Sequence, residues 1–156
     1  MEFNMATITE VRPAHQLQFN PKRKVTTHRL PFVGGRQTGY GTSFWHVPAT
    51  GGYSGGCQTG EALAGIYLKH LRDHGGEQFG ALQRIALSMF DCDLTASRHG
   101  QVVGFFARLD AWLVAAAKTM GESLDAVSND ALLSKANDGI NLDEAAYLAS
   151  LGLDKE

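Results

Sequence analysis

The sequence predicts an α+β fold, in which a small N-terminal antiparallel β-hairpin or sheet packs on a C-terminal bundle of four to five helices. All four prolines lie at or before Pro48, so no proline interrupts a helix after that position. Nine of the 18 glycines fall between Gly34 and Gly60, as is typical of a region rich in turns. Further along, apolar residues recur every three or four positions, which is the spacing of amphipathic helices.

The length of the chain favours one folded domain that follows a short arm. A sequence of 156 residues fits a single domain. Residues 1–24 hold little apolar surface, and we expect them to form an extended, flexible arm. Residues 25–156 are expected to form the globular domain, β-rich over 25–56 and helical over 57–156.

Two segments in the first third of the chain predict the hairpin. Thr26–Val33 and Tyr40–Val47 are rich in β-branched and aromatic residues, and the glycine-bearing stretch GGRQTG joins them. Pro31 lacks a backbone N–H and therefore places the first segment at the edge of the sheet.

The helical pattern covers most of the rest of the chain. The expected helices are Thr59–His74, Glu77–Phe90, Ser97–Met120 and two short ones within 128–136 and 141–152. Ser97–Met120 has both an apolar stripe and a face of small residues, so we place it centrally in the bundle. The predicted core residues are Leu63, Val102, Phe105, Leu109, Trp112 and Leu113.

One candidate catalytic site centres on Cys57, which glycines surround just before the expected start of a helix. The N-terminal end of a helix stabilises a thiolate, and a thiolate is the nucleophilic form of cysteine. His46 lies eleven residues upstream, at the end of a predicted strand, where it could act as the base. This pair predicts a cysteine-dependent hydrolase or transferase.

The same stretch has two other interpretations. Free N–H groups of Gly55, Gly56, Gln58 and Thr59 could bind an anion at the helix start. Alternatively the glycines only form a tight turn, and Cys57 is a small buried apolar residue. The sequence contains no zinc motif and no cofactor motif, so we expect neither a metal nor a cofactor.

A candidate interaction surface combines aromatic and basic side chains. Its members are Phe32, Tyr40, Trp45 and Tyr53 around the hairpin, and Lys22, Arg23 and Lys24 in the arm. Exposed aromatic residues with a polar rim are typical of binding surfaces. Charge is also separated along the chain, with a net +4 over residues 1–40 and −6 over residues 121–156.

These patterns favour a small, non-enzymatic interaction or regulatory protein that docks on another macromolecule, most simply another protein or protein complex. An accessory protein of a bacterial mobile element or phage, such as an inhibitor of a host defence system, is one such role. The alternatives are the cysteine-dependent enzyme and a nucleic-acid-binding accessory protein that uses the basic arm. Without an N-terminal apolar segment we expect a cytoplasmic protein with no membrane contact.

Overall fold

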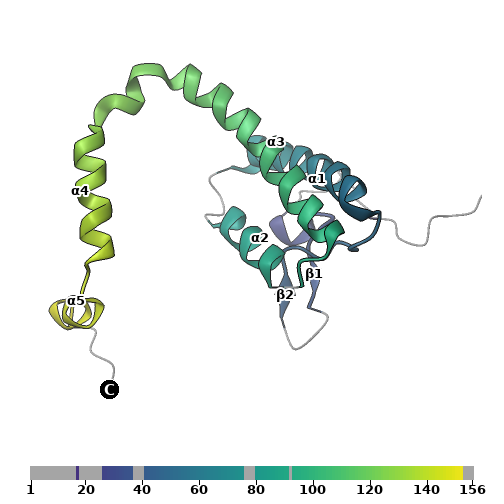
Figure 1. Cartoon of the computed structure of the whole chain (residues 1–156), viewed down its shortest axis with the longest axis horizontal. Helices are drawn as coiled ribbons and strands as arrows, with labels where there is room; N and C mark the ends of the chain where they lie inside the picture. The colour runs from purple at the N-terminus through teal and green to yellow at the C-terminus, as the bar shows by residue number, and fades with distance from the viewer. Residues whose placement is uncertain (1–16, 18–25, 37–40, 76–79, 92, 153–156) are drawn as a thin grey trace, which may run out of the picture. The chain divides into compact units, whose positions relative to one another are not determined.

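The computed structural model describes residues 17, 26–36, 41–75, 80–91 and 93–152. It confirms the α+β class, with a two-stranded antiparallel sheet and five α-helices among these residues (Figure 1). The elements in chain order are η1 (Thr27–Arg29), β1 (Gly34–Gly35), β2 (Thr42–Ser43), α1 (Gly52–His74), α2 (Ala81–Phe90), α3 (Ala96–Met120), η2 (Gly121–Ala126), α4 (Asn129–Ile140) and α5 (Glu144–Ser150). The chain divides into two compact units, residues 1–112 and residues 113–156.

The predicted hairpin exists, but its strands are much shorter than the sequence indicated. Gly34 pairs with Ser43 and Gly35 pairs with Thr42. The segment that was expected to be the first strand instead contains the 3-10 helix η1. Directly after β2, the Phe44 N–H donates to the Ser88 hydroxyl on α2, at 3.0 Å, so this N–H takes no part in the pairing of the two strands.

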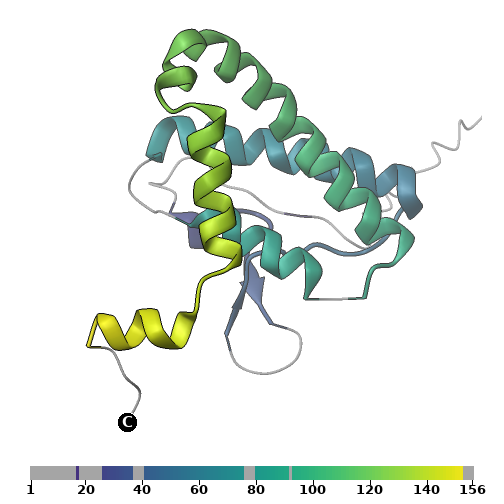
Figure 2. The ribbon, with the colours of Figure 1, turned by 60° about the vertical axis from the view of Figure 1, so that its left-hand side comes forward.

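Helix α1 begins seven residues earlier than predicted, at Gly52 instead of Thr59. The N-cap residue Gly51 has φ 85°, a left-handed conformation that favours glycine. The glycine-rich stretch is therefore the first two turns of a helix and not a loop. Figure 2 shows α1 running alongside α3 within the first unit.

Pairs of glycines one helical turn apart form the contact between α1 and α3. Gly56 and Gly60 lie on α1, and Gly100 and Gly104 lie on α3. A Cβ atom on Gly60 would lie 2.1 Å from the Gln101 carbonyl oxygen, and one on Gly104 would lie 2.1 Å from the Cys57 carbonyl oxygen. The two backbones are thus in direct contact, which explains why glycines are tolerated inside these helices despite their low helix propensity.

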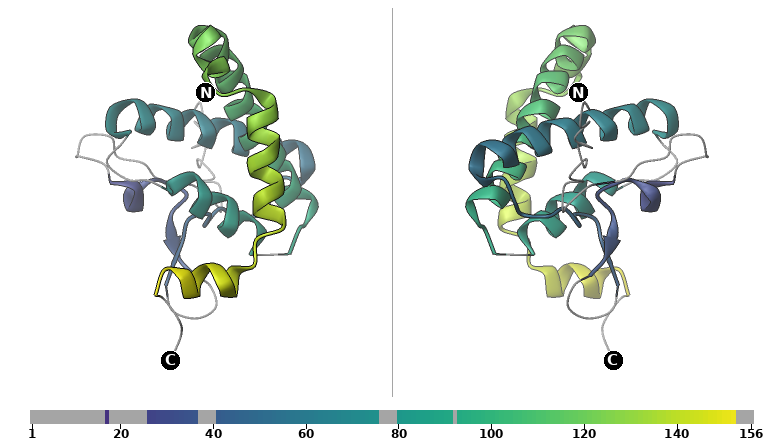
Figure 3. Two further views of the ribbon diagram at one scale, coloured as in Figure 1. Left: turned by 90° about the vertical axis from the view of Figure 1, so that its left-hand side faces the viewer. Right: turned by 90° about the vertical axis from the view of Figure 1, so that its right-hand side faces the viewer.

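The hydrophobic core of the first unit lies between the hairpin region and helices α1, α2 and α3 (Figure 3). Its centre is Phe105, whose ring lies 5.1 Å from that of Trp45 and 6.1 Å from that of Tyr67, centroid to centroid. The buried apolar residues are Leu30, Phe32, Phe44, Trp45, Val47, Leu63, Ala64, Tyr67, Ala81, Ile85, Met89, Phe105 and Leu109.

The predicted core stripe of α3 is confirmed only in part. Phe105 and Leu109 are buried, as is Leu63 on α1, whereas Val102 is half-buried. Two members were predicted wrongly, because Trp112 is 55% exposed and Leu113 is 63% exposed. Helical periodicity identifies the apolar face of a helix, but it does not show how far along the helix that face is covered.

The second unit consists of the last turns of α3, followed by η2, α4 and α5. Its helices have well-formed N-caps. The Ser128 hydroxyl accepts from the Ala131 N–H at 3.2 Å, and the Asp143 carboxylate accepts from the Ala146 N–H at 3.1 Å. No residue between 113 and 152 is buried in the structure.

Candidate functional site

Cys57 lies in the second turn of α1, half-buried, with a free thiol. The expectation that it precedes the helix is corrected by the earlier start of α1. His46 is exposed and packs beside Gly34, where an added Cβ would lie 2.8 Å from the His46 Cγ atom. No hydrogen bond between these described residues joins His46 to Cys57, so the structure gives the catalytic pair no geometric support.

The side-chain neighbour of Cys57 is Tyr53, one turn earlier on α1. A hydrogen bond between their side chains raises the pKa of Tyr53, and repulsion between the two groups in their charged forms adds to that effect. The Tyr53 ring also packs edge-on against the ring of His99 on α3, with centroids 5.8 Å apart. A phenol with a raised pKa is a poor base near neutral pH, so Tyr53 does not take the role expected of His46.

The expected anion-binding loop is part of α1. Helix formation uses the backbone N–H groups of Gly55 and of the residues that follow it; the Gly55 N–H, for example, donates to the Gly51 carbonyl at 3.1 Å. The Thr59 hydroxyl donates to the Gly55 carbonyl at 2.9 Å. Gly56 faces Ser97 on α3, so close that a Cβ atom would lie 2.2 Å from the Ser97 carbonyl oxygen. The predicted anion site required free backbone N–H groups at these positions, and the helix does not leave them free.

The candidate aromatic surface is also corrected. Phe32 is 0% exposed and Trp45 is 2% exposed, so neither contacts a partner while the protein is folded. Tyr53 is 48% exposed and remains available. Tyr40 and the basic residues at positions 22–24 lie outside the described residues.

A buried polar network, which the sequence analysis did not predict, attaches the segment that follows β2 to helix α3. The Gln101 side-chain oxygen accepts from Trp45 Nε1 at 3.0 Å and from Arg98 Nη1 at 2.8 Å. The Gln101 amide donates to the Pro48 carbonyl at 2.8 Å, and Arg98 Nη2 donates to the Val47 carbonyl at 3.2 Å. Satisfied networks of this kind specify packing. The sequence did contain a signal for this network, because Arg98 and Gln101 are polar residues three positions apart at the start of an apolar helix.

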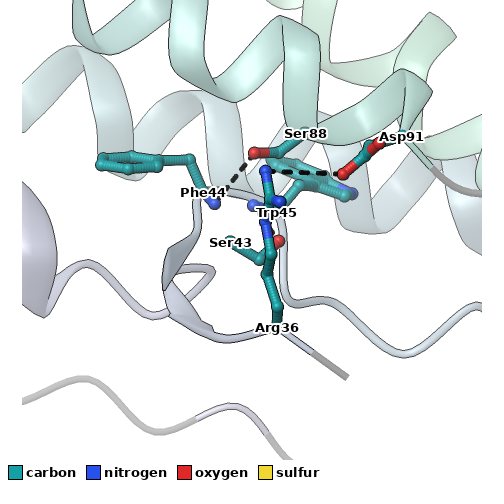
Figure 4. A network of polar contacts seen from close by, with 6 residues as sticks. All are labelled: Arg36, Ser43, Phe44, Trp45, Ser88 and Asp91. Atoms are coloured by element: carbon teal, nitrogen blue, oxygen red, sulfur yellow. Dashed lines mark hydrogen bonds and ion pairs between the residues drawn. The ribbon is translucent and has the colours of Figure 1, made fainter. Parts of the chain in front are cut away.

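A second polar cluster joins the hairpin to α2, as Figure 4 shows. Besides the bond from the Phe44 N–H to Ser88, Arg36 forms an ion pair with Asp91 at 3.6 Å. Both of these side chains are at least half exposed, and exposed ion pairs contribute little to stability. This cluster is therefore structural support of modest strength.

The histidines of α1 do not form a metal site with their described neighbours. The rings of His70 and His74 lie 5.2 Å apart, and His70 Nε2 lies 3.3 Å from the Thr27 hydroxyl. Among the described residues, no group of three or more histidine, cysteine or acidic side chains is placed to hold a metal ion.

The most unusual feature of the described chain is the apolar surface of the second unit. Leu133 and Ile140 lie on one face of α4, two turns apart, and Leu132 lies beside that face. Leu133 is 62% exposed and Ile140 is 80% exposed. We call the following set the C-terminal apolar residues: Leu113, Val114, Met120, Leu124, Val127, Leu132, Leu133, Ile140, Leu142, Tyr147 and Leu151.

One helical run passes a simple test for a membrane span. Ala96–Ala126 has 31 residues and contains an 18-residue window of mean hydropathy 1.2, of which 28% is buried. The core helix of a globular unit passes the same test, and length and composition alone do not separate the two cases. The first turns of this run carry the buried polar residues Arg98 and Gln101 and the glycine contact with α1.

No known protein family, curated protein or solved structure matches the chain. Its function is therefore inferred from its own residues.

Proposed function

We propose that the protein is a non-enzymatic interaction protein that docks on another macromolecule through residues 113–152. The observation that carries the proposal is the exposure of the C-terminal apolar residues on helices that are otherwise well formed. Contiguous exposed apolar side chains are typical of surfaces that bind a partner.

The lengths of the helices strengthen this reasoning. α4 has 12 residues and α5 has seven. Isolated helices shorter than about 12–15 residues are marginal in water, and an N-cap adds only about 1 kcal/mol. Most helical stability comes from burying an apolar face. A partner that covers the C-terminal apolar residues would supply that burial, at about 1.5–3 kcal/mol for each leucine or isoleucine.

The segment begins as the continuation of α3, which spans Ala96–Met120. The glycine contact and the Gln101 network hold the first turns of α3 within the first unit. Fixing one end of a docking segment lowers the entropy that is lost on binding. Regulators and inhibitors act by covering a surface of their target, and this is the kind of role that we propose.

Photo-crosslinking in cells of the source organism tests the proposal. The photoreactive amino acid p-benzoylphenylalanine is placed at position 133 in one variant and at position 87 in another. Leu87 on α2 is a matched control, because it is 64% exposed and Leu133 is 62% exposed. We expect one discrete adduct from position 133 and none of the same size from position 87. The same adducts from both positions, or none from either, would refute the proposal.

A further inference from the structure

Acidic side chains accompany the C-terminal apolar residues. Residues 113–152 contain two lysines, Lys118 and Lys135, against six acidic residues. The acidic residues are Glu122, Asp125, Asp130, Asp138, Asp143 and Glu144. None of the six forms an ion pair with a described residue, since the ion pairs of the described chain all lie in the first unit.

Two of the carboxylates lie beside the apolar faces of α4 and α5. Asp130 precedes Leu133 by three residues on α4, and Glu144 precedes Tyr147 by three residues on α5. Residues at that spacing are neighbours on a helix surface. Each apolar face therefore has a negative charge beside it that no described residue neutralises.

We infer that the partner of residues 113–152 is a protein segment that presents an apolar face bordered by lysine or arginine, such as a basic amphipathic helix. This inference rests on the proposed function and names the class of partner. Leucine-type side chains of the partner would cover Leu132, Leu133 and Ile140, and its basic residues would pair with Asp130 and Glu144 at the rim.

The charge of the segment disfavours three other occupants. Nucleic acid and anionic lipid surfaces carry negative charge and are repelled by a segment of net charge −4. A second copy that paired through the same segment would place like charges together. A basic, apolar protein segment is the occupant that satisfies both the apolar and the acidic character of this surface.

The test uses the full-length protein and two synthetic peptides. One is an amphipathic leucine/lysine peptide of about 14 residues, and the other has glutamate in place of every lysine. Tryptophan fluorescence follows binding, because Trp112, which directly precedes the segment, is 55% exposed, whereas Trp45 is buried. We expect the leucine/lysine peptide to bind at least about tenfold more tightly at about 50 mM salt, and this advantage to shrink at about 500 mM salt.

Variants separate the apolar contribution from the charged one. Leu133→Ser together with Ile140→Ser should weaken binding of the leucine/lysine peptide by about tenfold or more, whereas Leu87→Ser should leave it unchanged. Asp130→Asn together with Glu144→Gln keeps the apolar face and should reduce both the affinity and its salt dependence. This second pair keeps the test valid if the first pair unfolds α4.

Four results would overturn the inference. They are no binding of the leucine/lysine peptide, equal affinity for both peptides, an equal loss of affinity in Leu87→Ser, and a dimer in sedimentation equilibrium that Leu133→Ser dissociates. Failure of the proposed function is distinguishable from these. If position 133 crosslinks to one target but the leucine/lysine peptide does not bind, the docking role stands and only the basic partner is refuted.

Discussion

Replacing Gly60 with alanine probes the contact between α1 and α3 directly. The new Cβ atom would lie 2.1 Å from the Gln101 carbonyl oxygen and 2.8 Å from the Phe105 amide nitrogen. Ordinary contacts of a Cβ atom begin at 3.4 Å, so the helices must move apart by about 1.3 Å. Both obstructing atoms belong to the backbone of α3, and no flexible side chain can move aside to relieve the clash.

Two opposing effects determine how much Gly60→Ala changes the free energy of unfolding. Overpacking a well-packed contact costs about 1–3 kcal/mol, and separation would also disturb the packing of Phe105 at the centre of the core. Alanine is favoured over glycine in a helix by about 0.5–1 kcal/mol. We therefore expect Gly60→Ala to lower the free energy of unfolding by about 1–2 kcal/mol.

Urea unfolding, followed by circular dichroism, measures this difference. Gly65→Ala is the matched control, because Gly65 lies on the same helix and an added Cβ would meet nothing within 4 Å. At Gly65 only the higher helix propensity of alanine acts, so the free energy of unfolding should rise by up to about 1 kcal/mol. The same substitution is thus expected to have opposite signs at two positions of one helix. A neutral or stabilising Gly60→Ala would refute the reasoning.

Three further predictions concern the core, the polar network and Tyr53. Leu109→Ala should cost about 2–5 kcal/mol in urea unfolding, whereas Leu113→Ala, at an exposed position, should cost less than about 0.5 kcal/mol; similar costs would contradict the difference in burial between the two positions. Gln101→Leu removes an acceptor from two buried donors and should cost about 1–3 kcal/mol in the same assay; an unchanged stability would show that the network is dispensable. Cys57→Ala should lower the pKa of Tyr53 towards about 10 in a spectrophotometric titration, and an unchanged titration would rule out the thiol as the cause. Because folding raises the pKa of Tyr53, the linked stability is present below about pH 10 and is lost as the pH rises through the raised value.

Much of the fold could be predicted because apolar periodicity is local information. Leu63, Phe105 and Leu109 were predicted to be in the core and are buried. The hairpin followed from its flanking aromatic residues, but its first strand was placed too early, because Gly34 and Gly35 of β1 lie in the stretch that was expected to be the turn. Strand length did not follow, because the Phe44 N–H donates to Ser88 on α2 and the regular pairing is interrupted there; the two segments next meet at the bond from the His46 N–H to the Phe32 carbonyl.

The glycine-rich start of α1 could not be predicted from local preferences. Each glycine in a helix costs about 1 kcal/mol relative to alanine, so local reasoning favours a loop there. Only the close approach of α3 offsets that cost, and a contact between residues such as Gly60 and Gln101 is not local. The four-residue spacing of Gly56–Gly60 and Gly100–Gly104 was the signal for the contact.

The place of Cys57 was mispredicted for the same reason. The sequence was interpreted as a turn that ends at Cys57, whereas Cys57 lies within α1, where Tyr53, one turn earlier, is beside the thiol. The exposure of the C-terminal apolar residues was missed because a sequence pattern shows which face of a helix is apolar and not whether that face is covered. The exposure became visible only when the structure placed Leu133 and Ile140 in solvent.

Amide hydrogen exchange of the purified, full-length protein tests the central claim most directly. If the C-terminal apolar residues are uncovered in the isolated chain, the amides of α4 and α5 should exchange with protection below about tenfold, because neither helix is long enough to persist alone. The amides of α1 around Leu63 should be protected by several orders of magnitude, since they belong to the core unit. Protection of α4 equal to that of α1 would show that its apolar face is already covered, and would contradict the claim that residues 113–152 await a partner.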